Sequence, residues 1–358
     1  MRPLHTILAI DIGAGTQDIL LYDAGITPEN CVCMIVPAPW RHFAKIIERS
    51  ESDIFIAGDP IGGGAISTAL LQHLRRGFRV IMSEDAAYTV RNSLSEVMQY
   101  GISIAAAEGI DGFAGKTISF REIDWPLLRE FLSSYDDVGT PDLVAVAVQD
   151  HGVPPAGVSN RVFRFKMLEQ QLRKDNRLAS FVYSADDLPA CFKRMGAVAR
   201  RAQAQCGCDA LVMDTCLAAI LGCLENNGPA LVVNVGNSHT IAALVRDDRI
   251  IGLLEHHTGC LSTEKLDSIL VRFIRGGVSS EEIFNDGGHG VVMLERNNGQ
   301  VDQTVTVTGP NRHMLTGSRL NVHFAAPHGN MMLTGSFGLI RAAHLRFGCP
   351  SALPPTGG

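Results

Sequence analysis

The stretch Thr6-Ile-Leu-Ala-Ile-Asp11-Ile-Gly13-Ala-Gly15-Thr16-Gln17-Asp18-Ile-Leu-Leu-Tyr-Asp23 decides the fold. Two apolar runs typical of β-strands flank a turn of glycine and threonine, which predicts a hairpin. A dinucleotide-binding fingerprint would need glycine in place of Asp18 and a helix after the turn, but Ile19–Tyr22 is strand-like. A turn of this kind can offer backbone N–H groups and a hydroxyl to phosphate oxygens, while Asp11 holds Mg²⁺ through water.

A second copy of this design occurs more than 200 residues later, in Val233-Asn234-Val-Gly236-Asn237-Ser238-His239-Thr240. One copy alone would be an ordinary glycine-rich hairpin. Two copies in one chain predict a pair of phosphate-binding hairpins that face each other.

Strands and helices alternate between the two copies, which predicts parallel α/β units. We expect a strand at 143–148, a polar segment at 160–165 and a helix at 190–205. With 358 residues, two lobes are the natural expectation. We place the first lobe in residues 1–205, with an insertion at about 50–180, the second lobe in 206–345, and a flexible tail in 346–358.

Composition narrows the class of protein. A net charge of −6 with 46% hydrophobic residues argues against a disordered or strongly basic chain, so we expect no nucleic-acid partner. The N-terminal apolar run Ile7–Ile10 is too short for a signal peptide or membrane span. The nine cysteines are odd in number and lie mostly in apolar segments, as in a reduced protein. We therefore expect a cytoplasmic protein with no membrane association.

Five motifs in order resemble those of the actin, heat-shock-chaperone and sugar-kinase ATPase superfamily. They are the two hairpins, the segment Asp214-Thr-Cys-Leu-Ala218-Ala219-Ile-Leu-Gly222 between them, Val307-Thr308-Gly309-Pro310-Asn311-Arg312, and Gly335-Ser-Phe-Gly338-Leu-Ile. The resemblance implies a two-lobed α/β fold, a duplicated ribonuclease H-like ATPase with an insertion in its first lobe. It also implies ATP and Mg²⁺ as cofactors.

The resemblance also assigns residues to the nucleotide site. The candidate ATP-binding residues are Gly13, Gly15, Thr16, Gln17, Gly236, Asn237, Ser238, Thr240, Gly309 and Pro310. Asp11 would hold Mg²⁺ through water, and Asp214 would orient the attacking group. One departure matters: the second hairpin normally begins with Asp, and Asn234 can neither act as a base nor offer a charged ligand.

Further segments resemble a bacterial and archaeal group within that superfamily, often labelled pyruvate formate-lyase-activating-enzyme-like. They are Gln149-Asp-His-Gly152, Glu255-His-His-Thr-Gly259, Asp286-Gly-Gly-His-Gly290 and Gly329-Asn-Met-Met-Leu-Thr-Gly335. The chain lacks the three-cysteine run that holds a radical iron–sulfur cluster, so we do not expect radical chemistry. The label still suggests an ATP-dependent activator of another enzyme.

Two further constellations lie outside the hairpins. Asp150 and His151 follow an apolar strand, where α/β proteins place catalytic residues, and Arg161 and Arg164 could bind an anionic substrate. An Asp–Arg contact that joins loops is the equal alternative.

Five histidines stand in loops or at strand ends, namely His151, His239, His256, His257 and His289. Converging imidazoles could bind a transition metal, although loop histidines more often only form hydrogen bonds.

These observations predict an ATPase or small-molecule kinase that closes its lobes on Mg-ATP. The alternative is a nucleotide-gated protein that hydrolyses little and changes its affinity for a client enzyme. The two hypotheses call for different partners: a small-molecule phosphoryl acceptor or a client enzyme.

Overall fold

The computed structural model describes residues 4–106, 109, 112–135, 137–224, 230–295 and 304–347. The tail expected over 346–358 lies outside the described residues from residue 348 onwards. Within the described residues, every helix is too short or too polar to cross a membrane.

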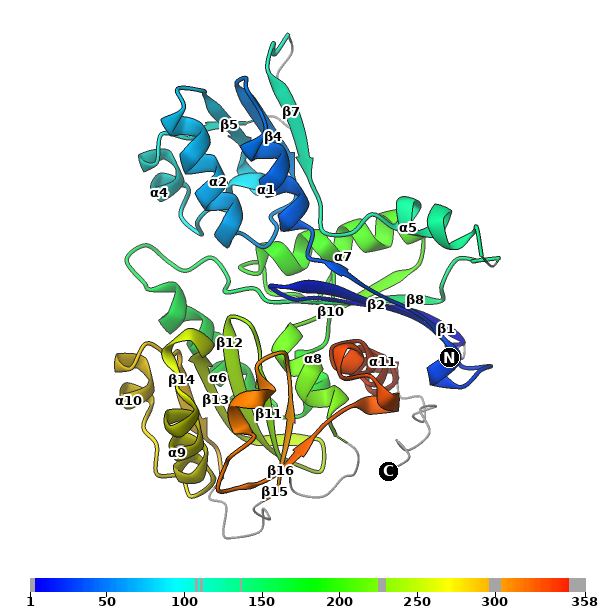
Figure 1. Cartoon of the computed structure of the whole chain (residues 1–358), viewed down its shortest axis with the longest axis vertical. Coiled ribbons are helices and arrows are strands. Elements are labelled where there is room, and N and C mark those ends of the chain that lie inside the picture. Colours follow the sequence, from blue (N-terminus) through cyan, green and yellow to red (C-terminus); the bar gives the residue numbers. More distant parts are fainter. Residues whose placement is uncertain are drawn as a thin grey trace.

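Two six-stranded sheets share one plan (Figure 1). In each, an antiparallel meander of three strands is extended by two parallel strands on the side of its first strand. The first sheet has the order β3-β2-β1-β8-β10-β9, with β1 Thr6–Ile12, β2 Thr16–Asp23, β3 Val32–Pro37, β8 Leu143–Val148, β9 Tyr183–Ser184 and β10 Asp209–Met213. The second has the order β14-β13-β12-β11-β15-β16, with β11 Ala230–Val235, β12 His239–Arg246, β13 Arg249–His257, β14 Gly290–Met293, β15 Thr304–Thr308 and β16 Asn321–Phe324. This repetition confirms the predicted two-lobed, duplicated ribonuclease H-like fold, which is similar to the fold of actin and the sugar kinases.

Two helices fill the space between the sheets, α8 Thr215–Gly222 and α11 Thr334–Phe347 (Figure 1). They cross at two glycines. A Cβ atom on Gly338 would stand 1.8 Å from the carbonyl oxygen of Ala218, and one on Gly222 would stand 1.8 Å from that of Thr334. Only glycine allows this approach, which brings the starts of both helices to the same end of the sheets.

The outer faces of the sheets are covered separately. Helices α5 Trp125–Leu132 and α7 Lys193–Cys206 cover the first sheet, and α9 Thr263–Ile274 and α10 Ser280–Asn285 cover the second. Short 3-10 helices lie at Pro28–Asn30, Leu178–Phe181, Thr258–Cys260, Arg312–Leu315, Pro327–Gly329 and Met331–Leu333.

A third sheet forms a small subdomain, at the top of Figure 1, with its own hydrophobic core. Its order is β6-β5-β4-β7, all parallel, with β4 Ile54–Gly58, β5 Val80–Ser83, β6 Ser103–Ala105 and β7 Lys116–Phe120. Its helices are α1 Trp40–Glu48, α2 Gly64–Arg75, α3 Glu84–Ala87 and α4 Leu94–Gln99. The insertion therefore occupies about residues 40–120 rather than 50–180, because β8 returns to the first sheet at Leu143.

Two other expectations need correction. Strand β10, which lies beyond the boundary expected at 205/206, pairs with β8 as the fifth strand of the first sheet. The polar segment expected at 160–165 is the first part of helix α6, Asn160–Lys174. Its charged residues obscured an apolar stripe at Phe165, Leu168 and Leu172 that is buried on one side of the helix.

Candidate functional site

The two predicted hairpins have the same internal geometry. In the first turn the N–H of Gly13 donates to the carbonyl of Thr16 at 2.9 Å, and in the second the N–H of Gly236 donates to the carbonyl of His239 at 3.0 Å. The turns also meet, because a Cβ atom on Gly15 would stand 2.6 Å from the amide nitrogen of Asn237. The hairpins therefore face each other across the space between the sheets.

A cavity of about 190 Å³ lies between the hairpins. Most of the residues that the sequence assigned to the nucleotide line it: Asp11, Gly13, Gly15, Thr16, Gly236, Asn237, Ser238, Gly309 and Pro310. The loop after β15 closes one side. Asn311 binds the second hairpin there through its backbone and side-chain amides, which donate to the carbonyls of Val235 and Gly236 at 3.0 and 2.9 Å.

Gln17 and Thr240, both predicted nucleotide residues, do not line this cavity. The Gln17 amide donates to the carbonyl of Glu122 at 3.3 Å, and the Thr240 hydroxyl meets that of Thr258 at 3.0 Å. The strand register explains both positions. Asp11 pairs with Asp18 in the first hairpin, and Asn234 pairs with Ile241 in the second, so Gln17 and Thr240 occupy equivalent positions. Successive side chains of a strand alternate between its two faces, and both of these residues lie on the face away from the cavity. The counterpart of Thr16 is His239, which does line the cavity.

Two acidic side chains, Asp11 and Asp18, lie in the cavity wall. Burial raises the pKa of Asp11 to about 8, against the effect of a hydrogen bond from the Thr215 hydroxyl at 2.5 Å. Burial also raises the pKa of Asp18 to about 6, and its Oδ1 is buried with no partner among the described residues. Buried carboxylate oxygens of this kind fit Mg²⁺, which prefers hard oxygen ligands and keeps several of its waters.

The start of α11 is part of the same wall. A Cβ atom on Gly335 would stand 1.9 Å from Oδ2 of Asp11, so the helix backbone lies directly against the carboxyl group. Gly335 and Thr215 are not among the predicted site residues. Both lie inside the motifs quoted for the resemblance, and Thr215 directly follows the predicted Asp214.

Asp214 itself does not line the hairpin cavity. Its Oδ1 accepts from the Cys216 N–H at 2.9 Å and caps α8, and its Oδ2 accepts from Nη1 of Arg164 at 2.8 Å. Nε of Arg164 donates to Glu255 at 2.9 Å, and all three charged side chains are buried. Arg164 is therefore held inside the protein by acidic side chains and is not exposed toward a substrate.

The Asp150 carboxylate is also held by hydrogen bonds within the fold. Its Oδ1 accepts from the N–H of Gly152 at 2.8 Å, and its Oδ2 accepts from those of Arg194 and Met195 at 2.8 and 3.0 Å. Burial raises the pKa of this carboxyl, and the backbone donors oppose the shift. Its observed contacts join the loop after β8 to the start of α7.

A larger cavity of about 670 Å³ adjoins the first and shares Gly13, Thr215, Asn237 and His239 with it. The basic side chains in its lining are Arg91, Arg161, Lys193 and Arg194. The glycine loop before α2 lines it too, but the N–H of Gly62 already donates to Oε1 of Glu122 at 2.9 Å, which also binds Arg194.

The predicted histidines separate into two groups. His256 is bonded to the carbonyl of His257 and to Asp286, each at 3.0 Å. His151, His239 and His289 converge, and His257 lies beside them. Burial lowers the pKa of His151 to about 3 and that of His239 to about 2, and it lowers the pKa of His289 and His257 as well. These rings are neutral at pH 7.

Several solved structures resemble the chain at low identity. An inorganic polyphosphate/ATP-glucomannokinase from Arthrobacter sp. strain KM has a TM-score of 0.39 and 11% identity, over 95% of this chain and 99% of that one. The ethanolamine utilization protein EutJ from Carboxydothermus hydrogenoformans has a TM-score of 0.32 and 12% identity, over 95% and 89%. MreB5 of Spiroplasma citri bound to ADP has a TM-score of 0.30 and 10% identity, over 93% and 94%.

No curated protein matches the chain. One family model does, over residues 61–314 of 358, and its description reads "Putative pyruvate format-lyase activating enzyme (DUF1786)". That match spans most of the chain and includes the second hairpin, the loop after β15 and all five of the predicted histidines. The chain belongs to the DUF1786 family.

Proposed function

We propose that this protein binds Mg-ATP between its two hairpins and uses it to phosphorylate a small acceptor or to hydrolyse ATP. The observation that carries the proposal is the pair of hairpins, closed by the same N–H to carbonyl bond and facing each other across a cavity that holds Asp11 and Asp18. Turn N–H groups would bind phosphate oxygens, and the two carboxyl groups would hold hydrated Mg²⁺. The Gly309-Pro310 loop would take the adenosine.

An acceptor would occupy the larger cavity. Its basic lining, with Arg161 and Lys193, favours an anionic molecule. The hairpin cavity, at about 190 Å³, is smaller than the ~300–1,000 Å³ of most small-molecule sites. We therefore expect the lobes to separate when ATP enters and to close on it afterwards.

A second candidate is a nucleotide-gated switch that hydrolyses little. Asn234 supplies no charge where the superfamily has Asp, and both oxygens of Asp214 are engaged in the fold. With Asp11 and Asp18 holding Mg²⁺, neither of these carboxylates would be left to activate water, and hydrolysis would be slow, since general-base assistance contributes ~10²–10⁴-fold. ATP binding would then change the affinity of this protein for a client enzyme. Such a role would agree with the word "activating" in the family's description.

The proposal contains no radical step. A radical iron–sulfur cluster needs three cysteine thiolates, whereas the one group of three potential metal ligands found in the described part of the chain is made of histidines. We place the protein in the cytoplasm, because Cys31, Cys206 and Cys216 are buried free thiols.

Calorimetric titration with ATP, with and without Mg²⁺, tests the proposal, and ADP formation is followed in the same samples. We expect Mg-dependent binding that weakens at least ~10-fold in Asp11→Asn, a loss of ~1.4 kcal/mol. Asp23→Asn, at the far end of the same hairpin, is the matched control and should bind as the wild type does. Binding with ADP formation supports the enzyme, and binding without it supports the switch. A folded wild-type protein that binds no Mg-ATP would refute both.

A further inference from the structure

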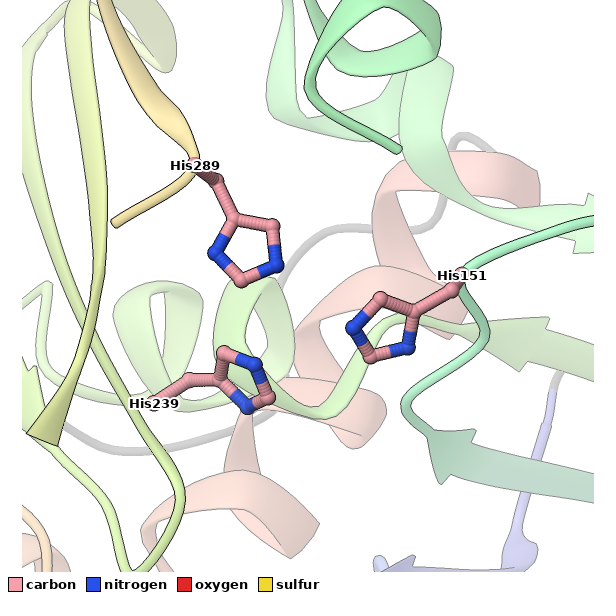
Figure 2. A group of neighbouring side chains, drawn as sticks. All are labelled: His151, His239 and His289. Carbon is pink, nitrogen blue, oxygen red and sulfur yellow. The ribbon is translucent and has the colours of Figure 1, made fainter. Parts of the chain in front are cut away.

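Three histidines from separate segments converge at the edge of the larger cavity. His151 lies in the loop after β8, His239 begins β12 and His289 directly precedes β14. Figure 2 shows their rings pointing toward one another. One ring nitrogen of each lies within 4.8 Å of the corresponding nitrogens of the other two.

Within the described residues, no hydrogen bond to the ring of His239 or His289 explains this arrangement. His239 is 8% exposed and His289 is 3% exposed, and both ring nitrogens of each are buried with no partner among the described residues. Buried polar groups that are left without partners destabilise the fold. A ligand that accepts electron pairs from all three rings would remove much of that destabilisation.

The surroundings keep the three rings neutral, which is the form that binds a metal. Burial and the nearby Arg164 guanidinium lower the pKa of all three. Arg164 itself is paired with Asp214 and Glu255, so acidic side chains lie beside its charge.

The donor set selects the ion. Neutral imidazole is a ligand for Zn²⁺ and similar transition metals, whereas Mg²⁺ prefers the carboxylates of the neighbouring hairpin cavity. Tetrahedral Zn²⁺ with bonds of ~2.0–2.1 Å places its nitrogen ligands ~3.3 Å apart, so the rings need to move inward by only about an ångström. Three imidazoles with one open position is the arrangement of catalytic rather than structural zinc sites.

We propose that His151, His239 and His289 bind one divalent transition-metal ion of the Zn²⁺ type, with an open coordination position toward the larger cavity. His151 and His239 line that cavity, so a molecule inside it can reach the ion. The ring of His257 lies 4.6 Å from that of His239 and 4.7 Å from that of His289, centroid to centroid, and also lines the cavity. It is placed to bind a metal-bound water or a substrate oxygen. A Lewis acid here would polarise an anionic or carbonyl-bearing acceptor.

The test uses full-length protein without an affinity tag, stripped with a chelator and titrated with Zn²⁺ against a chromogenic competitor. We expect one Zn²⁺ per chain, with affinity at least ~100-fold lower in His289→Gln and in His151→Gln. His42→Gln, an exposed histidine of α1, is the control and should bind as the wild type does. Co²⁺ added in place of Zn²⁺ should give the strong visible absorption of a four-coordinate site, and each ligand variant should lose it.

The outcomes are separable from those of the nucleotide experiment. Asp11→Asn should keep Zn²⁺ binding while its Mg-ATP binding weakens, and His289→Gln should keep Mg-ATP binding while its Zn²⁺ binding weakens. His151→Gln changes a less buried side chain than His289→Gln, so it serves where the latter fails to fold. No stoichiometric Zn²⁺ in the folded wild type, or equal affinity in the folded ligand variants, would overturn the proposal whether or not ATP binds.

Discussion

At the scale of the residue, Asp11 shows a conflict between stability and binding. Its pKa in the folded protein is about 8, against an ordinary value of 3.8, because burial disfavours the charged form. Protonated Asp11 therefore contributes stability that is fully present below pH 4 and is lost as pH rises toward 8. Mg²⁺ binds the ionised form of Asp11, and that form destabilises the folded protein when no cation is bound.

This conflict predicts that Asp11→Asn stabilises the protein when no Mg²⁺ or nucleotide is present. The variant should exceed the wild type in free energy of unfolding by more than about 1 kcal/mol at pH 8, with a smaller difference at pH 5. Denaturant unfolding at the two pH values measures it. The equivalent position of the second hairpin is already Asn234, so the substitution suits the turn. A variant less stable than the wild type at pH 8 would contradict the burial argument.

The sequence predicted most of the residues in the hairpin cavity because turn composition is a local signal. Gln17 and Thr240 do not line that cavity. The strand register decides which face a side chain occupies, and the register depends on pairing that one strand does not encode. Asp214 and Arg164 were assigned to chemistry because nothing local shows that they meet each other and Glu255, 41 residues beyond Asp214 in the chain.

At the scale of the element, the crossing of α8 and α11 depends on glycine. Gly338→Ala would place a methyl group in the space of the Ala218 carbonyl, whose backbone cannot move without shifting α8. We expect a loss of ~1–3 kcal/mol, as for other overpacked cores, together with weaker Mg-ATP binding because both helices begin at the nucleotide cavity. Thermal unfolding and calorimetry measure the two effects.

Gly64→Ala is the matched control, because a Cβ atom on this helical glycine of α2 would have no neighbour within 4 Å. It should leave stability unchanged or raise it slightly. Equal melting temperatures for Gly338→Ala and the wild type would mean that the two helices can separate freely.

Elements were predictable where their signal is periodic. Apolar runs indicated both hairpins and the strand at 143–148, and the second hairpin was recognisable as a copy of the first. The short strands β9, β14 and β16 were not predicted. Helix α6 was missed since its charged residues dominate the composition. Strand β10 was assigned to the wrong side of the boundary because membership of a sheet depends on tertiary pairing, here with β8.

At the scale of the whole molecule, Arg164 joins the two lobes. Asp214 follows β10 of the first sheet and Glu255 lies in β13 of the second, so one guanidinium bridges both. Arg164→Met would leave two buried carboxylates without their counter-charge. We expect a loss of ~3–5 kcal/mol of stability, measured by denaturant unfolding.

Arg173→Met provides the comparison, because Arg173 lies on the same helix in an exposed pair with Glu169. Its loss should cost no more than ~1 kcal/mol. Arg164→Met with wild-type stability and only an altered substrate KM would instead restore the substrate role that the sequence suggested.

The position of α11 also has a consequence for the newly made chain. This helix packs against β1, β2 and β8, yet its residues leave the ribosome long after those of the three strands. Ala9, Leu20 and Ala145 on the inner face of the first sheet thus lack this cover until α11 has been made. The first sheet must wait, exposed to chaperones and to other nascent chains, for α11 to complete it. Truncation before residue 334 would therefore yield an aggregating fragment rather than a smaller folded protein.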